Sequence, residues 1–412
     1  MSDLVDEQPG AGGKTLKPPA PSDRVITRDF VIVTLTGLFA LMGFSSTLPL
    51  VPRYMENELG ASKVEIGIAL GIFSISALLA RPYVGKLGDT RGRRFIIVAG
   101  TALTALSVAA HALAVSVPLM LVIRLAMGAT QGAFFVGTAT LVNDLAPPHR
   151  RGEATSYFSV AIYAGMAFGP LMGELVEDAA GFKWAFVAGG VCLVMASFLA
   201  LLLPPHRPVR IAGSPAPSGK WLHPAAIGPG LVLMCGIVSF VALNGFMPLY
   251  VEEFDLGKAG PVFVTYGLLV LVIRLAGSKL PDKLGTVRTT ILALVGQAVG
   301  MAMMGGWNTK AGLYAGAVVL AVGGSFLYPA LLTAAIANVD ASERARATGT
   351  FSMAFELSAG LGGPILGWAA SFGGNRATFF ASAIAAVAGL PLLYGWATRH
   401  PTQIIAGTRS SA

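Results

Sequence analysis

The chain has 412 residues, of which 54% are hydrophobic and only 12% are charged, and its mean hydropathy is +0.69. A soluble domain usually carries about 25% charged residues, so this chain cannot cover a water-soluble surface of ordinary size. The composition therefore excludes a soluble enzyme, a disordered chain and a nucleic-acid-binding protein, and it indicates a polytopic membrane protein. The net charge of +8 does not by itself indicate a nucleic-acid partner. Membrane proteins concentrate Lys and Arg on the cytoplasmic side, so the distribution of these residues among the loops is what matters.

Apolar stretches of about 20 residues cross the hydrocarbon layer of a membrane as helices. Twelve such stretches occur in the sequence, at roughly 30–50, 64–84, 95–115, 118–142, 156–176, 184–203, 226–250, 261–281, 289–307, 311–337, 348–371 and 377–397. The sequence therefore predicts an all-α membrane protein with twelve transmembrane helices.

The longest polar interruption is 204–225, which follows the sixth stretch and has the Pro, Gly and Ser content of a linker. It divides the chain into two halves of six helices each. We therefore expect a disordered N-terminal tail (1–29), a first bundle (30–203), a linker (204–225), a second bundle (226–397) and a C-terminal tail (398–412).

The loop charges predict the orientation. With the N-terminus in the cytoplasm, the cytoplasmic segments hold 20 Lys and Arg residues and the outer loops hold six. This bias predicts that both tails and the linker are cytoplasmic.

The two halves repeat each other. The segment Arg81–Asp89 matches Arg274–Asp282 at Arg, Lys, Leu and Asp with an offset of 193 residues. The segment Gly165–Gly173 matches Ala359–Gly367 at an offset of 194 residues, including the Pro after the second Gly position. Halves of six helices have the same orientation in the membrane, which is the parallel-repeat arrangement of two-bundle transporters. We therefore expect two pseudo-symmetric six-helix bundles with a substrate path between them.

Several of these segments resemble signatures of one family. The sequence Gly85-Lys-Leu-Gly-Asp89-Thr-Arg91-Gly92-Arg93-Arg94 resembles motif A of the major facilitator superfamily, and Arg124-Leu-Ala-Met-Gly128 resembles its motif B. Gly165–Gly173 resembles motif C, which marks the antiporters. Asp144–Ala154 resembles the matching loop of the twelve-span drug:proton antiporters, the multidrug efflux branch. Two positions depart from the patterns, with Met127 where motif B usually has Gln and Glu174 where motif C often has Gly.

The resemblance implies a gating role for motif A, namely Gly85, Asp89, Arg91, Gly92, Arg93 and Arg94. Gly88 and Gly92 allow a tight turn beside Asp89, whose carboxylate can meet a cationic side chain or a helix N-terminus. Breaking that contact would bias the two access states of a transporter. The alternative is that Lys and Arg here only anchor the loop at the membrane surface.

The glycines of motif C lie four residues apart, at Gly165, Gly169 and Gly173, and therefore share one helix face. They allow another helix to approach closely, and Pro170 bends the helix by removing one backbone hydrogen bond. We expect a close, kinked seam that seals the outer side. Ordinary helix packing is the alternative.

Charges inside the membrane carry the chemistry, because each must face the protein interior or water. Arg124 is expected either to take part in proton coupling or to act as a hydrogen-bonding hub. Glu356 lies about eight residues, or about 12 Å, into its span. Burial disfavours the charged form of a carboxyl group, so Glu356 is our candidate proton carrier. A contact with a cationic substrate and a structural pairing with an Arg are the alternatives.

We expect three further charged residues near the ends of their spans to contact the membrane surface or water rather than the substrate. Arg81 and Arg274 lie near the cytoplasmic ends of their spans, where long side chains reach for the interface. Glu174 lies near the outer end of its span, where we expect it to be hydrated.

Polar and aromatic positions at middle depth predict the lining of the substrate cavity. They are Phe44, Gln131, Phe135, Tyr163, Asn244, Tyr266, Gln297 and Tyr328. With Glu356 they would form a mostly apolar pocket with one acid, which suits amphipathic and even cationic molecules.

No nucleophile–base pair, metal-ligand spacing or phosphate loop is visible, so we expect neither an enzyme nor a metal or cofactor. We expect a secondary active transporter that exports a small amphipathic or drug-like molecule in exchange for protons by alternating access. The resemblance implies a monomer in the plasma (inner) membrane, with small molecules, protons and lipid as partners and no nucleic acid. An importer of a small metabolite and a transport-inactive receptor or scaffold are the alternatives.

Overall fold

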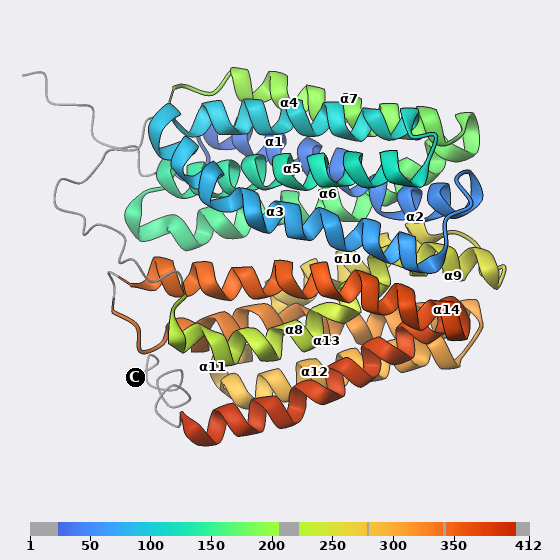
Figure 1. The fold of residues 1–412 in the computed structure, drawn as a ribbon. Helices are drawn as coiled ribbons and strands as arrows, with labels where there is room; N and C mark the ends of the chain where they lie inside the picture. The colour runs from blue at the N-terminus through green and yellow to red at the C-terminus, as the bar shows by residue number, and fades with distance from the viewer. Residues whose placement is uncertain (1–23, 206–221, 278–279, 341–342, 401–412) are drawn as a thin grey trace, which may run out of the picture.

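The computed structural model describes residues 24–205, 222–277, 280–340 and 343–400. Helices follow one another along almost all of these residues (Figure 1). They are α1 (Arg28–Ser45), α2 (Thr47–Asn57), α3 (Lys63–Arg91), α4 (Arg93–Ala110), α5 (Val117–Leu145), α6 (Arg151–Ala180), α7 (Phe182–Leu201), α8 (Pro224–Gly245), α9 (Met247–Glu253), α10 (Ala259–Ala276), α11 (Leu280–Leu284), α12 (Thr286–Gly306), α13 (Lys310–Ile336) and α14 (Arg344–Arg399), with short 3₁₀ turns at His111–Leu113 and Pro148–Arg150.

The helices form two bundles that lie side by side. Figure 1 shows α1–α7 in blue to green above α8–α14 in yellow-green to red. The largest contacts between the bundles join α3 to α14 and α6 to α10. We call the end at Gly92, where α3 meets α4, the motif A end. The end where α2 and α9 lie is the opposite end.

Twelve membrane-crossing helices are present in the described part of the chain. Eleven helical stretches are long and apolar enough to cross a membrane. The last one contains two of the expected spans, because Gly373 and Gly374 have non-helical backbone angles and divide α14. The first expected span, by contrast, is a single span that consists of two helices, α1 and α2, which meet at Ser46.

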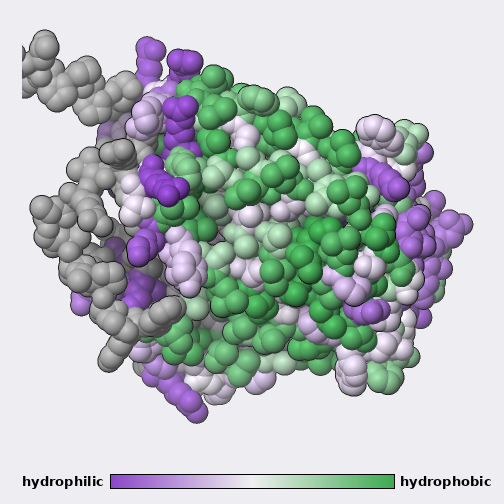
Figure 2. All heavy atoms as spheres, turned by 45° about the horizontal axis from the view of Figure 1, so that its top comes forward, coloured by the Kyte–Doolittle hydropathy of each residue, from purple (hydrophilic) through white to green (hydrophobic). Residues whose placement is uncertain are grey.

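The surface supports the membrane assignment. Figure 2 shows a broad hydrophobic band across the middle of the visible face, with hydrophilic residues gathered at its two ends. Large apolar side chains on the long helices are exposed, as at Leu106, Phe198 and Ile384. Water would make such exposure costly, whereas lipid does not. The protein is therefore an integral membrane protein with an all-helical fold.

Local sequence signals explain where several helices begin. The hydroxyl of Thr27 accepts a hydrogen bond from the backbone of Phe30 at 3.2 Å and starts α1. Ser62 and Glu65 form a reciprocal capping box at the start of α3. Such side chains satisfy backbone N–H groups that a helix leaves unpaired in its first turn.

The internal repeat is also visible in the backbone. Gly92 and Gly285, 193 positions apart, have φ angles of 95° and 76° and connect consecutive helices. Gly181 and Gly374, again 193 positions apart, have φ angles of 86° and 67°. Only glycine adopts this backbone region readily. Two pairs of turns at the offset found in the sequence support the duplication of one six-helix unit.

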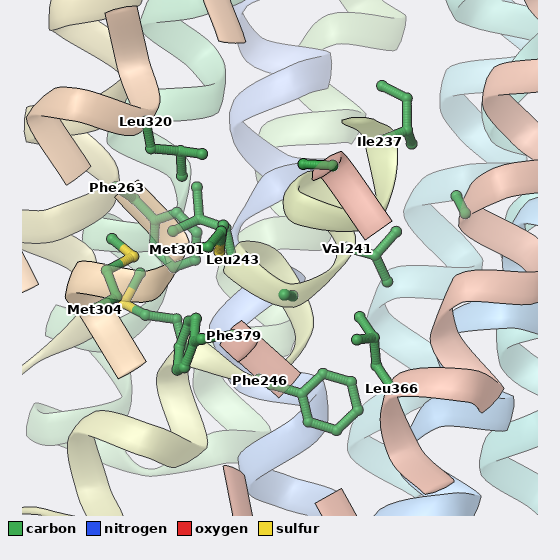
Figure 3. Packing of buried hydrophobic residues seen from close by; sticks show 14 of the residues in the cluster. Ile237, Val241, Leu243, Phe246, Phe263, Met301, Met304, Leu320, Leu366 and Phe379 are labelled. Carbon is green, nitrogen blue, oxygen red and sulfur yellow. The ribbon is translucent and has the colours of Figure 1, made fainter. Parts of the chain in front are cut away.

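The second bundle has a dense apolar core around α8. Figure 3 shows Leu243, Met301, Met304 and Phe379 packed together in this region. All four are fully buried. Such close packing holds the helices of the second bundle together around α8.

The helix bounds differ slightly from the expected bundle limits. The first bundle begins at Arg28 rather than 30, and the second runs from Pro224 to Arg399 rather than from 226 to 397. Most of the expected linker and both expected tails, at 1–23, 206–221 and 401–412, lie outside the described residues.

Candidate functional site

A cavity of about 520 Å³ lies between the two bundles. One wall comes from α5 and α6, and the other comes from α8, α10, α12, α13 and α14. It extends to Asn143, two residues before the end of α5, and to Thr155, four residues after the start of α6. Both helix ends belong to the motif A end, so the cavity opens in that direction.

Six of the eight predicted cavity residues line this cavity. They are Phe135, Tyr163, Asn244, Tyr266, Gln297 and Tyr328. Phe44 and Gln131 are not among the lining residues. Phe44 instead stacks on Phe73 of its own bundle, with ring centroids 5.5 Å apart.

Arg274 lies in the cavity wall, which differs from the expectation that it would reach for the membrane surface. Its Nε donates a hydrogen bond to the carbonyl oxygen of Ser325 at 3.0 Å. Its guanidinium carbon lies 5.0 Å from the centroid of the Tyr163 ring. Tyr163 belongs to α6 and Arg274 to α10, so this cation–π contact joins the two bundles inside the cavity.

Two buried polar atoms of the cavity wall have no hydrogen-bond partner among the described residues. Gln297 is 4% exposed and its Oε1 is unpaired, and Ser239 is 1% exposed and its Oγ is unpaired. Both residues line the cavity. Buried polar groups are nearly always paired, so unpaired ones in a cavity wall point to a ligand or water that would satisfy them.

Glu356 forms an ion pair with Arg81 of the other bundle. Arg81 Nη2 lies 2.5 Å from Glu356 Oε1, and the two side chains are 31% and 12% exposed. The neighbouring residue Phe355 lines the cavity, whereas Glu356 does not. Successive residues on a helix point in directions about a quarter-turn apart, so Phe355 faces the cavity and Glu356 faces α3. The cavity expected to hold one acid is therefore lined by a cation instead.

Arg124 is 3% exposed, and its polar and cation–π contacts among the described residues lie within its own bundle. Its Nε donates to the carbonyl oxygen of Ala69 at 3.2 Å, and its guanidinium carbon lies 4.8 Å from the Phe73 ring centroid. No carboxylate of the described residues pairs with it. Arg124 therefore links α5 to α3 through a hydrogen bond and a cation–π contact.

Charged residues close the space between the bundles at the opposite end. Arg53 of α2 pairs with Glu177 of α6 at 2.5 Å and with Glu252 of α9 at 2.9 Å. Asn57 donates to the same Glu252 at 2.9 Å. A further ion pair joins Lys258 to the α6 residue Asp178. We call these six residues the inter-bundle cluster, because Glu252 and Lys258 belong to the second bundle and the other four to the first.

Glu174 strengthens this closure from a buried position. It is 3% exposed, and its two oxygens accept hydrogen bonds from the backbone N–H groups of Ala259 at 3.1 Å and Gly260 at 2.6 Å. These are the first two residues of α10. A carboxylate at a helix N-terminus satisfies unpaired donors and interacts favourably with the helix dipole. The expectation that Glu174 would be hydrated is therefore wrong in this conformation.

The sequence matches the profile of the Major Facilitator Superfamily over residues 33–309 and 259–411. These ranges together span nearly the whole chain. The chain belongs to the Major Facilitator Superfamily. It is therefore a transporter of small molecules in a membrane and not an enzyme. Among the residues that the structure describes, no group of three His, Cys, Asp or Glu side chains is placed to hold a metal.

Relatives of similar length share this assignment. An uncharacterised MFS-type transporter of Salmonella typhimurium is 26% identical over 396 residues, covering 91% of this chain and 99% of the relative. An uncharacterised MFS-type transporter of Pseudomonas aeruginosa is 29% identical over 392 residues, covering 91% and 95%.

Solved structures share the fold at low identity. The nucleoside transporter NupG has a TM-score of 0.71 at 13% identity, covering 90% of this chain and 99% of that one. The human organic anion transporter MFSD10 has a TM-score of 0.67 at 18% identity, covering 91% and 100%. A bacterial homologue of the human lysosomal transporter Spinster, in an inward-facing and occupied conformation, has a TM-score of 0.73 at 16% identity, covering 93% and 99%.

Motif A of this superfamily member lies mainly in a helix. The helix α3 continues through Gly85 to Arg91, so the expected loop is reduced to Gly92. Arg93 lies 3.6 Å from Asp144 near the end of α5, and Arg91 lies over the Phe95 ring at 5.1 Å. Arg94 follows in the first turn of α4. The side chain of Asp89 lies outside the described residues, so its gating contact stays a prediction.

Motif C contacts its own bundle. A Cβ at Gly165 would lie 2.8 Å from the carbonyl oxygen of Leu38, and one at Gly169 would lie 2.5 Å from that of Met42. Gly173 likewise packs on Ser46, and Pro170 lies within α6. The close seam of these glycines is therefore with α1 rather than with the second bundle.

The second copy of motif C packs across the bundles. A Cβ at Gly363 would lie 2.9 Å from the backbone N of Gly71 in α3, and one at Gly71 would lie 2.8 Å from Cδ of Pro364. Close approach of α3 and α14 thus depends on glycines from both bundles. Sequence analysis identified the Gly363–Gly367 copy but not its partners Gly67 and Gly71, which form a Gly-x-x-x-Gly pair in the second span.

Proposed function

We propose that this transporter exports a small amphipathic molecule in exchange for protons by alternating access. The observation that carries the proposal is the asymmetry of the space between the bundles. The cavity reaches the helix ends at the motif A end, whereas the inter-bundle cluster and Glu174 close the opposite end. Substrate would enter in this conformation and leave after the bundles tilt the other way.

We infer that the motif A end faces the cytoplasm of the cell, in the plasma (inner) membrane. The excess of Lys and Arg in the loops at this end supports the assignment. Both chain ends lie on this side in our proposal, and a single chain holds the whole path, so a monomer is sufficient.

Glu356 is our proposed proton carrier and Arg81 its partner. When Glu356 is ionised, the ion pair joins α3 to α14. A proton on Glu356 removes this attraction, which frees the bundles to change their relative tilt. Because Arg81 is about one-third exposed, water has a route by which the proton can leave toward the motif A end.

Arg124 is proposed to support this step indirectly. It joins α5 to α3, and α3 also carries Arg81. Its contact therefore fixes the helix from which the partner of the proton carrier projects.

The experiment is transport in everted membrane vesicles that are energised with a proton gradient. A panel of amphipathic fluorescent compounds of both charges serves as probe, with and without an uncoupler. Export predicts accumulation in the everted vesicles that the uncoupler abolishes. Uptake only in right-side-out vesicles would identify an importer, and no movement in either would identify a receptor or scaffold.

A further inference from the structure

We propose that the cavity binds an organic anion, whose negative group is held by Arg274 and whose aromatic or apolar body lies along the cavity wall. This inference rests on the proposed function insofar as it takes the cavity to be the transport site. It differs from the sequence-based expectation of a pocket with one acid, which would accept amphipathic molecules, including cationic ones.

The charge of the cavity is the first step. Among the described residues that line it, Arg274 is the one charged side chain. The carboxylates that could neutralise it are engaged elsewhere, since Glu356 pairs with Arg81 and Glu174 caps α10. No described carboxylate lies within ion-pairing distance of Arg274. A guanidinium stays charged in a protein, and a cation in an apolar cavity is stabilised by a counter-ion.

The geometry of Arg274 leaves donors for such an anion. Its Nε is used by Ser325, whereas no hydrogen bond is made by its two terminal nitrogens among the described residues. These nitrogens form a planar fork that matches a carboxylate, sulfonate or phosphate group. An anion at this fork would lie beside Tyr163 and would therefore touch both bundles.

The unpaired polar groups supply the second, independent observation. Gln297 Oε1 and Ser239 Oγ are buried, unpaired and part of the cavity wall. An amide oxygen accepts hydrogen bonds, and a hydroxyl both donates and accepts. They predict that the ligand carries at least one polar group besides its anionic one.

The remaining residues of the cavity wall indicate what the uncharged part of the ligand is like. It is largely apolar, and eight of its residues carry aromatic rings, among them Phe135, Tyr163, Tyr266, Tyr328 and Phe355. The volume of about 520 Å³ lies within the range of cavities that bind drug-sized molecules. An aromatic carboxylate or sulfonate combines the charge, the ring surface and the size that this cavity selects.

The test compares three naphthalene probes of matched size, namely 1-naphthylacetate, 2-(1-naphthyl)ethanol and 2-(1-naphthyl)ethylamine. Binding of each to the purified full-length protein in nanodiscs is measured by titration calorimetry. We expect the anion to bind at least tenfold more tightly than the neutral and cationic probes. Arg274→Gln should remove that preference, and Arg274→Lys should retain part of it because the charge remains.

Both variants are first checked for a single size-exclusion peak, so that loss of binding is not loss of fold. Equal binding of the three probes, no binding of the anion, or anion binding that Arg274→Gln leaves unchanged would overturn the anion site. If any of these results is found while proton-driven export of an amphipathic probe persists, the proposed function stands and this inference fails. If anion binding depends on Arg274 but no proton-driven flux is found, the anion site stands and the proposed function fails.

Discussion

Among the described residues, Glu356 and Arg81 form an ion pair that joins the two bundles away from the inter-bundle cluster. A buried charge pair is poor evidence of stability, because desolvation of the two ions offsets much of their attraction. Its position between the two bundles gives it the role of a switch in the proposed transport cycle. In that proposal, Glu356 loses its attraction to Arg81 when it takes up a proton, and the bundles can then tilt.

The variant Glu356→Gln tests this role. It keeps the size of the side chain and a hydrogen bond to Arg81 but cannot release a proton. We expect proton-driven transport in everted vesicles to fall at least tenfold, while insertion and the size-exclusion profile are unchanged. Glu153→Gln is the matched control, since that carboxylate bonds to Arg150 and to the Tyr157 hydroxyl, three and four residues away in its own bundle. Normal pH-dependent export by Glu356→Gln would remove Glu356 from the coupling step.

At the scale of helices, the inter-bundle cluster holds α2 and α6 to α9 and to the start of α10. Single exposed ion pairs contribute about 0–1 kcal/mol. A network around a side chain such as Arg53, which is 13% exposed, is stronger than an isolated pair. The cluster therefore biases the bundles toward closure at this end.

We expect Arg53→Gln to open the opposite end. Its removal breaks contacts to both Glu177 and Glu252. A cysteine at Leu171, which packs on Gly260 at this interface, should then react with an impermeant maleimide at least fivefold faster. Glu56→Gln is the control, because the Glu56–Lys63 pair does not cross the bundles. An unchanged labelling rate in Arg53→Gln would show that the cluster does not hold the end closed.

We expect the buried Glu174 also to hold the opposite end closed. Glu174→Ala removes both acceptors of the α10 N-terminus, whereas Glu174→Gln keeps one uncharged oxygen acceptor. The loss of a helix cap costs about 0.5–2 kcal/mol. We therefore expect the labelling rate to rise more in Glu174→Ala than in Glu174→Gln. Equal rates in both variants and the wild type would contradict a cap between the bundles.

The crossing of α3 and α14 allows a matched comparison within one helix. A Cβ at Gly71 would lie 2.8 Å from Pro364, whereas one at Gly85 would meet nothing within 4 Å. Overpacking costs about 1–3 kcal/mol, so Gly71→Ala should lower the melting temperature by several degrees and reduce transport. Gly85→Ala should leave the melting temperature within about a degree of wild type. The same thermal shift in both variants would mean that close packing at Gly71 does not decide the effect.

Across the whole molecule, the sequence predicted the architecture because lipid imposes simple rules on it. Twelve apolar stretches and a repeat at 193 residues were enough to predict two bundles of six helices, and the turns at Gly92 and Gly285 carry the same offset in the backbone.

The sequence could not predict which face of each helix points into the cavity. Glu356 was expected in the cavity and Arg274 at the surface, because periodicity is weak in helices that are apolar on all faces. A rotation of about 100° per residue separates Phe355 in the cavity from Glu356 at α3. Glu174 was expected in water, because no local signal links it to the start of a helix 85 residues later.

The most direct measurement follows the two ends of the molecule at once. Spin labels at exposed Arg151 and Arg288 report on the motif A end, and labels at exposed Lys183 and Lys310 report on the opposite end, with Cys192 and Cys235 replaced by Ala. We expect Arg53→Gln to shift the motif A pair to shorter distances and the opposite pair to longer ones, relative to the parent protein. Distances that stay fixed at both ends, or that change in the same direction, would contradict two rigid bundles that alternate access to a central cavity.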